Sequence, residues 1–452
     1  MRIVTESIPG ARSVSIGVVV ECGSRDENPD EAGLAHLCEH LVFQGTSNRD
    51  SRELARQMDA VGGSIGAFTT RDYTCYYATV QDEYSFHALD LMGDILLNPI
   101  FPEDELEREK NCVGREIEGN LDHPMSRAQQ LLMETIWPDH PLGRPVAGTM
   151  EYVRRHTRDD LIYFFHRHYV PERMIVAAAG NLEHEDFVAQ ARDVFWRVLG
   201  EKSLLPPRAP AFTPGFLHEV SASHQAYISI GLEAPTFANP DRYAFHVLNR
   251  VLGEGLHSRL FQRLREQSGL VYDVGSDYIA YRDAGLLRIE LATEPAQQRE
   301  ALQAVIETVA GLASWDQPVD EDELWRAKLQ LKSQYLIASE VVHTRMSRLA
   351  SQEIYFSSPF ETGAIPDAIE SVDMATLRRL AEQHLWQSLA NLTAVVISPT
   401  PIADLTDACG YRKFVRGAMS SHGHPIFCSG PGRPSGILET QALRKETAAN
   451  GN

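Results

Sequence analysis

Two histidines four residues apart constrain this chain more than any other feature of its sequence. His36 and His40 enclose Glu39 in the pattern H-x-x-E-H. Residues four positions apart lie on one face of an α-helix, so both imidazoles can reach the same metal ion. The preceding residues 28–31, Asn-Pro-Asp-Glu, supply a helix start, and apolar residues at helical spacing follow. We therefore predict a short metal-bearing helix over residues 33–44.

Glu39 lies close to the same helical face, where it can take a proton from the water that attacks a carbonyl group. A chain with 17 histidines can also show this pattern by chance, and then both histidines would be ordinary surface residues. The metal interpretation therefore needs a third ligand elsewhere in the chain, because catalytic zinc sites use three protein ligands and one open position.

The acidic stretch 102–118 offers that ligand. It begins with proline and carboxylates, which is typical of a helix N-terminus. Glu109 and Glu116 share one face of this helix with apolar Val113, which indicates carboxylates turned inward toward a cation. A solvated acidic helix would have the same composition, and spacing alone does not choose among Glu109, Glu116 and Glu118.

Several further segments of the sequence carry a resemblance to a known family. They are 33–35 and 43–46 around the histidine pair, 67–74, 141–149 and 258–272. With these segments, residues 1 to about 400 resemble the pitrilysin/insulysin family of zinc endopeptidases. Within that family, the chain is similar to the β subunit of the mitochondrial processing peptidase and to smaller bacterial homologues.

The resemblance implies a ligand set. In the family a Glu-Ile or Glu-Met pair supplies the third ligand about 76 residues after the motif, and Glu116 is followed by Ile117 at that distance from His40. By this likeness His36, His40 and Glu116 bind Zn²⁺, and Glu39 is the base. Glu109 occupies the position of a family glutamate that supports the metal site.

The resemblance also implies substrate contacts. An extended peptide pairs main chain to main chain with the strand that contains Ala67 and Phe68. Arg265 and Tyr272, seven residues apart, hold the substrate backbone and stabilise the anionic intermediate. Gly66 stands where the family usually has asparagine, which removes one side-chain hydrogen bond to the substrate.

Cys38 lies inside the metal motif and has two interpretations. A thiol beside a metal would make the activity sensitive to alkylation or oxidation. A small buried residue that packs the helix is the favoured alternative, because free cysteines are usually buried.

Composition indicates a two-domain enzyme. The chain has 452 residues, more than one hydrophobic core usually serves, with 43% hydrophobic and 23% charged residues. No apolar run is long enough to span a membrane. The net charge of −20 argues against nucleic-acid binding; it would favour basic peptides if it lined a cavity, whereas an acidic surface explains it equally well.

The N-terminus and the cysteines favour a cytoplasmic location. The chain begins with strand-like sequence and shows neither a signal peptide nor a transit peptide. Its six cysteines have irregular spacing and form no disulfide framework.

The predicted fold is α+β, with two homologous domains that each contain a mainly antiparallel sheet flanked by helices, forming half of a clamshell. The zinc-bearing domain covers 1–203, and a linker with four prolines covers 204–215. A second domain with the Arg/Tyr pair covers 216–407. The helix that contains Arg265 is predicted to correspond, in this repeated plan, to the histidine-bearing helix of the first domain.

Residues 408–452 are predicted to form a flexible tail. The segment is rich in glycine, proline and serine, and its His422, His424 and Cys428 lack the complete ligand pairs of a second metal site.

The predicted function is that of a zinc-dependent endopeptidase that cleaves unfolded peptides or precursor segments inside a chamber. Family members of this length need a second chain to close the chamber, so a homodimer is the simplest assembly. A heterodimer with a related subunit is the alternative, because some relatives divide the two motifs between subunits. A non-catalytic or partner-dependent subunit is the rival function, and zinc storage is a weaker one because it leaves Glu39 without a purpose.

Overall fold

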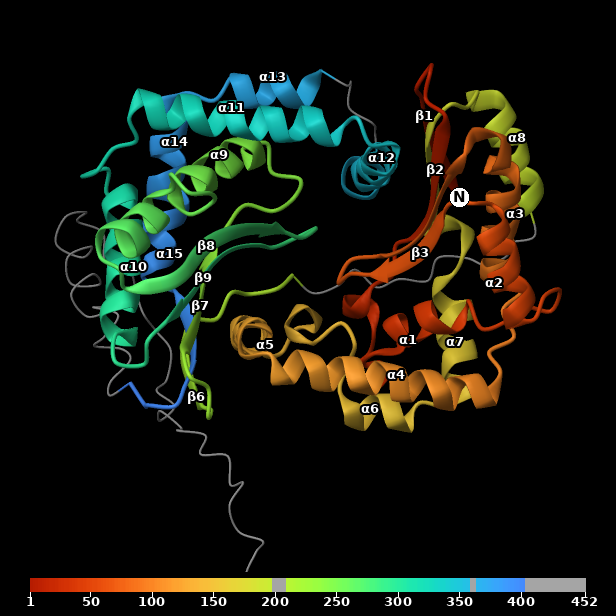
Figure 1. Ribbon diagram of the computed structural model, residues 1–452, viewed down its shortest axis with the longest axis horizontal. Helices are drawn as coiled ribbons and strands as arrows, with labels where there is room; N and C mark the ends of the chain where they lie inside the picture. The colour runs from red at the N-terminus through yellow and green to blue at the C-terminus, as the bar shows by residue number, and fades with distance from the viewer. Residues whose placement is uncertain (197–208, 358–362, 403–452) are drawn as a thin grey trace, which may run out of the picture. The chain divides into compact units, whose positions relative to one another are not determined.

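The computed structural model describes residues 1–196, 209–357 and 363–402, and it contains two five-stranded sheets (Figure 1). The predicted linker lies partly outside these residues, and the predicted tail lies wholly outside them. The domain boundaries therefore stay predictions. None of the helices in the described ranges combines the length and apolarity needed to cross a bilayer.

The first sheet has the strand order β1-β5-β2-β4-β3, in which β1 and β5 are parallel and the other neighbours are antiparallel. Strand β2 is rich in valine and buried along almost its whole length, as suits a central strand covered on both faces. Strand β3 lies at an edge of the sheet. The strands are β1 (Arg2–Ser7), β2 (Ser13–Val20), β3 (Ser64–Thr69), β4 (Thr74–Gln81) and β5 (Met174–Gly180).

Eight α-helices accompany the first sheet in the sequence. They are α1 (Leu34–Leu41), α2 (Ser51–Ala60), α3 (Ser85–Leu97), α4 (Glu103–Asp122), α5 (Pro124–Ile136), α6 (Met150–Arg155), α7 (Arg158–His168) and α8 (His184–Phe195). The predicted helices near 33–44 and 103–119 thus correspond to α1 and α4, which pack against each other.

The second sheet repeats the first, with the order β6-β10-β7-β9-β8 and the same single parallel pair at the same place. Its strands are β6 (Gly215–Val220), β7 (Ala226–Glu233), β8 (Val271–Ala280), β9 (Gly285–Thr293) and β10 (Thr393–Ser398). The predicted class, two α+β domains with mainly antiparallel sheets, is confirmed.

The helices of the second half include two π-helical segments. In chain order they are α9 (Arg242–Leu252), a π-helix (Phe261–Gln267), α10 (Gln298–Ala313), α11 (Glu321–Ala338), α12 (Val342–Phe356), α13 (Ala364–Glu370), α14 (Met374–Leu380), a second π-helix (Ala381–Trp386) and α15 (Gln387–Leu389). Between β7 and β8 the first helix is α9, as α1 is the first between β2 and β3. The π-helix that carries Arg265 is therefore equivalent to α2. The prediction that it is equivalent to the histidine-bearing helix α1 is wrong.

The two halves exchange one helix each. Helix α5 comes from the first half but packs on β7 and β10 of the second sheet, where its Leu132 and Ile136 share a core with Val395. Helix α12 comes from the second half but packs on β1, β2 and β5 (Figure 1). There Met346 lies against Gly17. A Cβ atom at position 17 would lie 2.3 Å from the Met346 sulfur, so the contact requires glycine.

A buried ion pair also joins the halves beside β3. The Arg25 guanidinium donates to Asp72 at 2.7 Å and to Asp283 at 2.8 Å, and the side chains of Arg25 and Asp72 are both 2% exposed. The second Asp72 oxygen accepts from the Tyr355 hydroxyl of α12 at 2.9 Å and from the Arg282 amide at 3.2 Å. Asp72 thus holds the turn between β3 and β4 against residues of the second half.

We expect Asp72→Asn to lower the free energy of unfolding by about 3 kcal/mol, because it leaves the buried Arg25 charge poorly compensated. Urea unfolding with linear extrapolation measures the change. Asp90→Asn is the matched control, since Asp90 pairs with Arg49 while its side chain is 52% exposed, and it should cost less than about 1 kcal/mol. Equal effects of the two variants would contradict a structural role for Asp72.

Candidate active site

The start of α1 is fixed by a buried carboxylate. Glu27 accepts hydrogen bonds from the amides of Gly33 at 3.0 Å and Ala35 at 2.8 Å, which are among the amides that a helix N-terminus leaves without partners. Burial raises the pKa of Glu27 to about 8, although these two hydrogen bonds lower it. Gly33 has φ +93°, and a Cβ there would lie 2.7 Å from the Ala147 carbonyl oxygen, so the site requires glycine.

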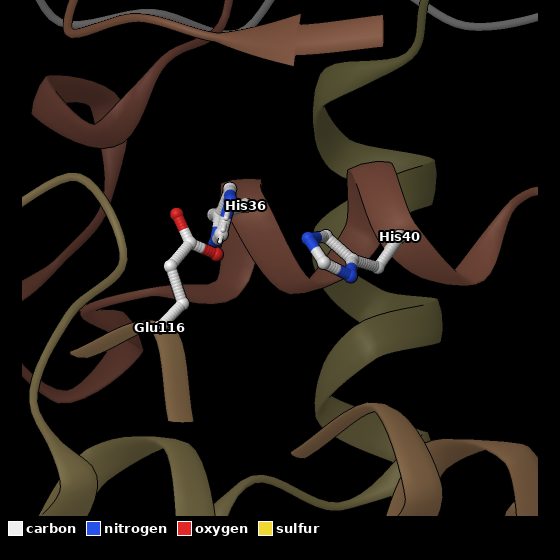
Figure 2. A group of neighbouring side chains, drawn as sticks. All are labelled: His36, His40 and Glu116. Carbon is white, nitrogen blue, oxygen red and sulfur yellow. Dashed lines mark ion pairs between the residues drawn. The ribbon is translucent and has the colours of Figure 1, made fainter. Parts of the chain in front are cut away.

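His36 and His40 lie on one face of α1, and Glu116 reaches them from α4 (Figure 2). One ligand atom from each of the three residues lies within 4.8 Å of the other two, and His36 Nε2 is 3.7 Å from Glu116 Oε2. Tetrahedral bonds of about 2.0–2.2 Å to zinc place donor atoms roughly 3.4 Å apart. Two imidazoles and one carboxylate at these separations therefore fit a zinc ion after small side-chain shifts.

His36 has the protonation that a metal ligand requires. Burial, with the nearby His40, lowers the pKa of His36 to about 4, so its ring is neutral near pH 7. The buried Nδ1 of His36 has no hydrogen-bond partner among the described residues, so no protein group fixes which ring nitrogen carries the proton.

Glu109 orients the second histidine. Its carboxylate lies 2.9 Å from His40 Nδ1 and accepts a hydrogen bond from Gln44 at 3.0 Å. This leaves His40 Nε2 for a metal, as in many sites where a carboxylate fixes the ring of a ligating histidine. In the part of the chain that the structure describes, the ligand group contains Glu116 and neither Glu109 nor Glu118.

Glu39 stands beside the ligands without joining them. Its carboxylate accepts a hydrogen bond of 2.7 Å from the Thr69 hydroxyl, at the end of β3. Burial raises the pKa of Glu39, while the bond from Thr69 and the charge of His40 lower it. A carboxylate held in this way beside a metal site can serve as a proton acceptor.

A cavity of about 930 Å³ opens onto these groups. His36, Glu39 and Glu116 line it together with edge strand β3, and parts of α4, α5 and β9 form other walls. The charged residues that line the cavity include both acidic and basic side chains. The negative net charge of the chain is therefore not concentrated in this cavity. These charged residues are Glu39, Glu116, Glu134, Glu151, Arg71, Arg127 and Arg288.

The predicted substrate strand contributes unequally to the cavity. Ala67 and Phe68 line it, as does Thr69, whereas Gly66 does not. A Cβ at position 66 would lie 2.9 Å from the Tyr77 hydroxyl, which occupies the space where a larger residue would project.

Arg265 and Tyr272 are not brought to this cavity within the chain. Neither belongs to its lining. The Arg265 guanidinium lies over the Phe261 ring at 4.9 Å, and Tyr272 is 76% exposed. Their contribution to catalysis stays a prediction.

Cys38 belongs to α1 and is fully buried, and burial raises the pKa of its thiol to about 12. A protonated, inaccessible thiol is a poor nucleophile. The packing interpretation is therefore the better one.

Sequence reasoning overlooked Thr69 and Arg71, both of which line the cavity. Thr69 follows Ala67 by two positions, and residues two apart in a strand share a face. That alternation was the available signal for a side chain directed at the metal helix.

The fold and the site together define a class, that of metallopeptidase-like chains with two related α+β domains and an H-x-x-E-H helix. The chain belongs to peptidase family M16. Residues 2–150 match the family model described as Insulinase (Peptidase family M16), and residues 155–331 match the one described as Peptidase M16 inactive domain. The predicted family is confirmed, while the finer likeness to the processing peptidase β subunit stays a prediction.

Curated relatives extend over most of the chain. An uncharacterized zinc protease of Mycobacterium leprae is 37% identical over 394 residues, covering 85% of this chain and 87% of the relative. The uncharacterized zinc protease YmxG of Bacillus subtilis is 33% identical over 400 residues, covering 88% and 96%.

Solved structures show the same fold. A peptidase M16 inactive domain from Pseudomonas fluorescens matches with a TM-score of 0.81 at 21% identity, covering 89% of this chain and 96% of that one. A protease from Helicobacter pylori matches with a TM-score of 0.80 at 21% identity, covering 88% and 97%.

Metal binding can distinguish Glu116 from its neighbour Glu118 on α4. Glu116→Gln should weaken zinc binding by more than the roughly 10- to 100-fold that loss of a supporting carboxylate costs, because it removes a ligand. Glu118→Gln, an exposed neighbour on the same helix, should leave binding unchanged. Competition with a chromogenic chelator measures both, and equal affinities would show that Glu116 is not a ligand.

Proposed function

We propose that this chain is a zinc-dependent endopeptidase that cleaves peptides bound in extended form. The observation that carries the proposal is a cavity lined by His36 and Glu116 of the ligand group, by the carboxylate of Glu39 and by the edge strand β3, with His40 completing the ligand group beside it. The names of the relatives, which call them zinc proteases, support both the metal and the reaction.

His36, His40 and Glu116 would hold the Zn²⁺. When bound, the ion supplies Lewis-acid chemistry, polarising a water molecule and the scissile carbonyl. Glu109 keeps the His40 ring in the orientation that this requires, through its 2.9 Å contact with Nδ1.

Glu39 moves the proton. Its carboxylate accepts a proton from the attacking water and then donates it to the nitrogen of the leaving amine. Strand β3 positions the substrate, since a peptide added to a sheet edge is held by main-chain hydrogen bonds in a defined register with that strand.

Glu39→Gln tests the reaction directly. The amide cannot accept the proton, so we expect kcat for a mixed peptide library to fall by about 10²- to 10⁴-fold while zinc content stays at one equivalent. Mass spectrometry of products and metal analysis of the same samples give both quantities. Full activity in a zinc-loaded variant would refute the proposed role of Glu39.

The assembly that we propose is a homodimer in which Arg265 and Tyr272 of the partner subunit complete each site. The support is their exposure in a single chain, away from the cavity whose chemistry they would serve. A heterodimer with a related subunit would need the same surface.

Subunit complementation distinguishes these arrangements. Glu39→Gln and Arg265→Ala chains should each be inactive, and mixing them should restore cleavage, because a mixed dimer contains one site with both native residues. A mixture of Glu39→Gln with His36→Ala is the control, since both defects lie on the metal side. No restoration in the first mixture would contradict the proposal that the partner subunit supplies Arg265.

A further inference from the structure

Thr69, at the end of β3, belongs to the edge strand and also hydrogen-bonds to Glu39. Thr69 is the last residue of this edge strand, it lines the cavity, and its hydroxyl donates to the Glu39 carboxylate at 2.7 Å. The threonine side chain thereby connects the strand predicted to bind peptide with the carboxylate proposed to move the proton.

The side-chain direction follows from the alternation of the strand. Ile65 and Ala67 pack against the core cluster that contains residues of α1, whereas Phe68 packs against the cluster that contains residues of α12. Thr69 follows Ala67 by two positions and so faces α1, the helix of Glu39. The short hydrogen bond is therefore a product of the sheet geometry.

The main-chain direction of Thr69 follows from the pairing of β3 with β4. The Thr70 amide donates to the Tyr73 carbonyl at 2.8 Å, which makes these two residues a hydrogen-bonded pair at the turn. Hydrogen-bonded and non-hydrogen-bonded pairs alternate along an antiparallel ladder. In the register Phe68↔Cys75 and Thr69↔Thr74, the main-chain groups of Thr69 and Ala67 therefore point away from β4, toward the free edge.

We propose that Thr69 is a positioning residue that sets the Glu39 carboxylate against a peptide paired with the β3 edge. This inference rests on the proposed peptidase function and adds a coupling within it. The main-chain groups of Thr69 fix the register of the substrate, and its hydroxyl fixes the base relative to that register. Neither task requires Thr69 to contact the metal or the reacting atoms.

The coupling predicts a divided kinetic effect. Thr69→Val keeps the shape and the main chain but removes the hydroxyl, so peptide binding should persist while the base is no longer held. We expect kcat to fall roughly ten- to a hundredfold, the worth of one hydrogen bond to a charged group, with KM within about threefold of wild type. Thr69→Ser restores the hydroxyl and should restore kcat.

Thr79→Val is the matched control. Thr79 lies on β4 of the same sheet, its hydroxyl pairs with Ser15 at 3.0 Å, and neither of these two residues lines the cavity. It should leave kcat and KM unchanged. Zinc content is measured on all variants and should equal that of wild type, which separates loss of positioning from loss of metal.

A crystal structure of zinc-loaded Thr69→Val provides a readout that does not depend on activity. The Glu39 carboxylate should leave its position at the end of β3, with His36, His40 and Glu116 unmoved. An unmoved Glu39, a wild-type kcat in Thr69→Val, or failure of Thr69→Ser to restore kcat would each overturn the proposal. If wild type itself cleaves no peptide, the peptidase proposal fails, and the crystal structure still decides whether Thr69 holds Glu39.

Discussion

Helix α1 begins where the buried carboxylate of Glu27 receives the amides of Gly33 and Ala35, and the geometry of the site depends on this contact. Each residue of an α-helix turns its side chain by about 100° relative to the next. A start displaced by one residue would therefore rotate His36 and His40 away from Glu116. Gly33 has φ +93° and lies close to the Ala147 carbonyl. Both features fix the residue that precedes the first turn of α1.

The exchange of α5 and α12 makes the two sheets depend on each other. Each sheet has one face covered by a helix that the opposite half of the chain provides, so neither half retains its full core alone. The same exchange builds the cavity, because α5 reaches the second sheet and also presents residues such as Gln130 and Glu134 to the metal site. Core packing and substrate space are thus formed by the same helix.

Local sequence patterns predicted which candidate ligands the fold brings together, because the main determinants of this group are local. Two histidines four residues apart lie on one face of a helix. Glu109 and Glu116 of α4, seven residues apart, also share one helical face. The choice of Glu116 over Glu109 needed the family resemblance, and the structure assigns Glu109 to His40. The helix exchange, the Asp72 contacts and the bond from Thr69 could not be predicted, since each joins residues whose proximity only the tertiary fold creates.

The free edge of β3 has a consequence for the substrates that the proposed peptidase can accept. Unpaired main-chain groups along a strand attract any other strand, and in open solution they invite sheets to join edge to edge. Here the walls of a cavity surround the outer end of that edge. The main-chain groups of a folded protein are already hydrogen-bonded to one another, so they cannot pair with the edge of β3. The proposed peptidase would thus select its substrates by conformation first and by side chain second, favouring chain segments that have lost their own structure.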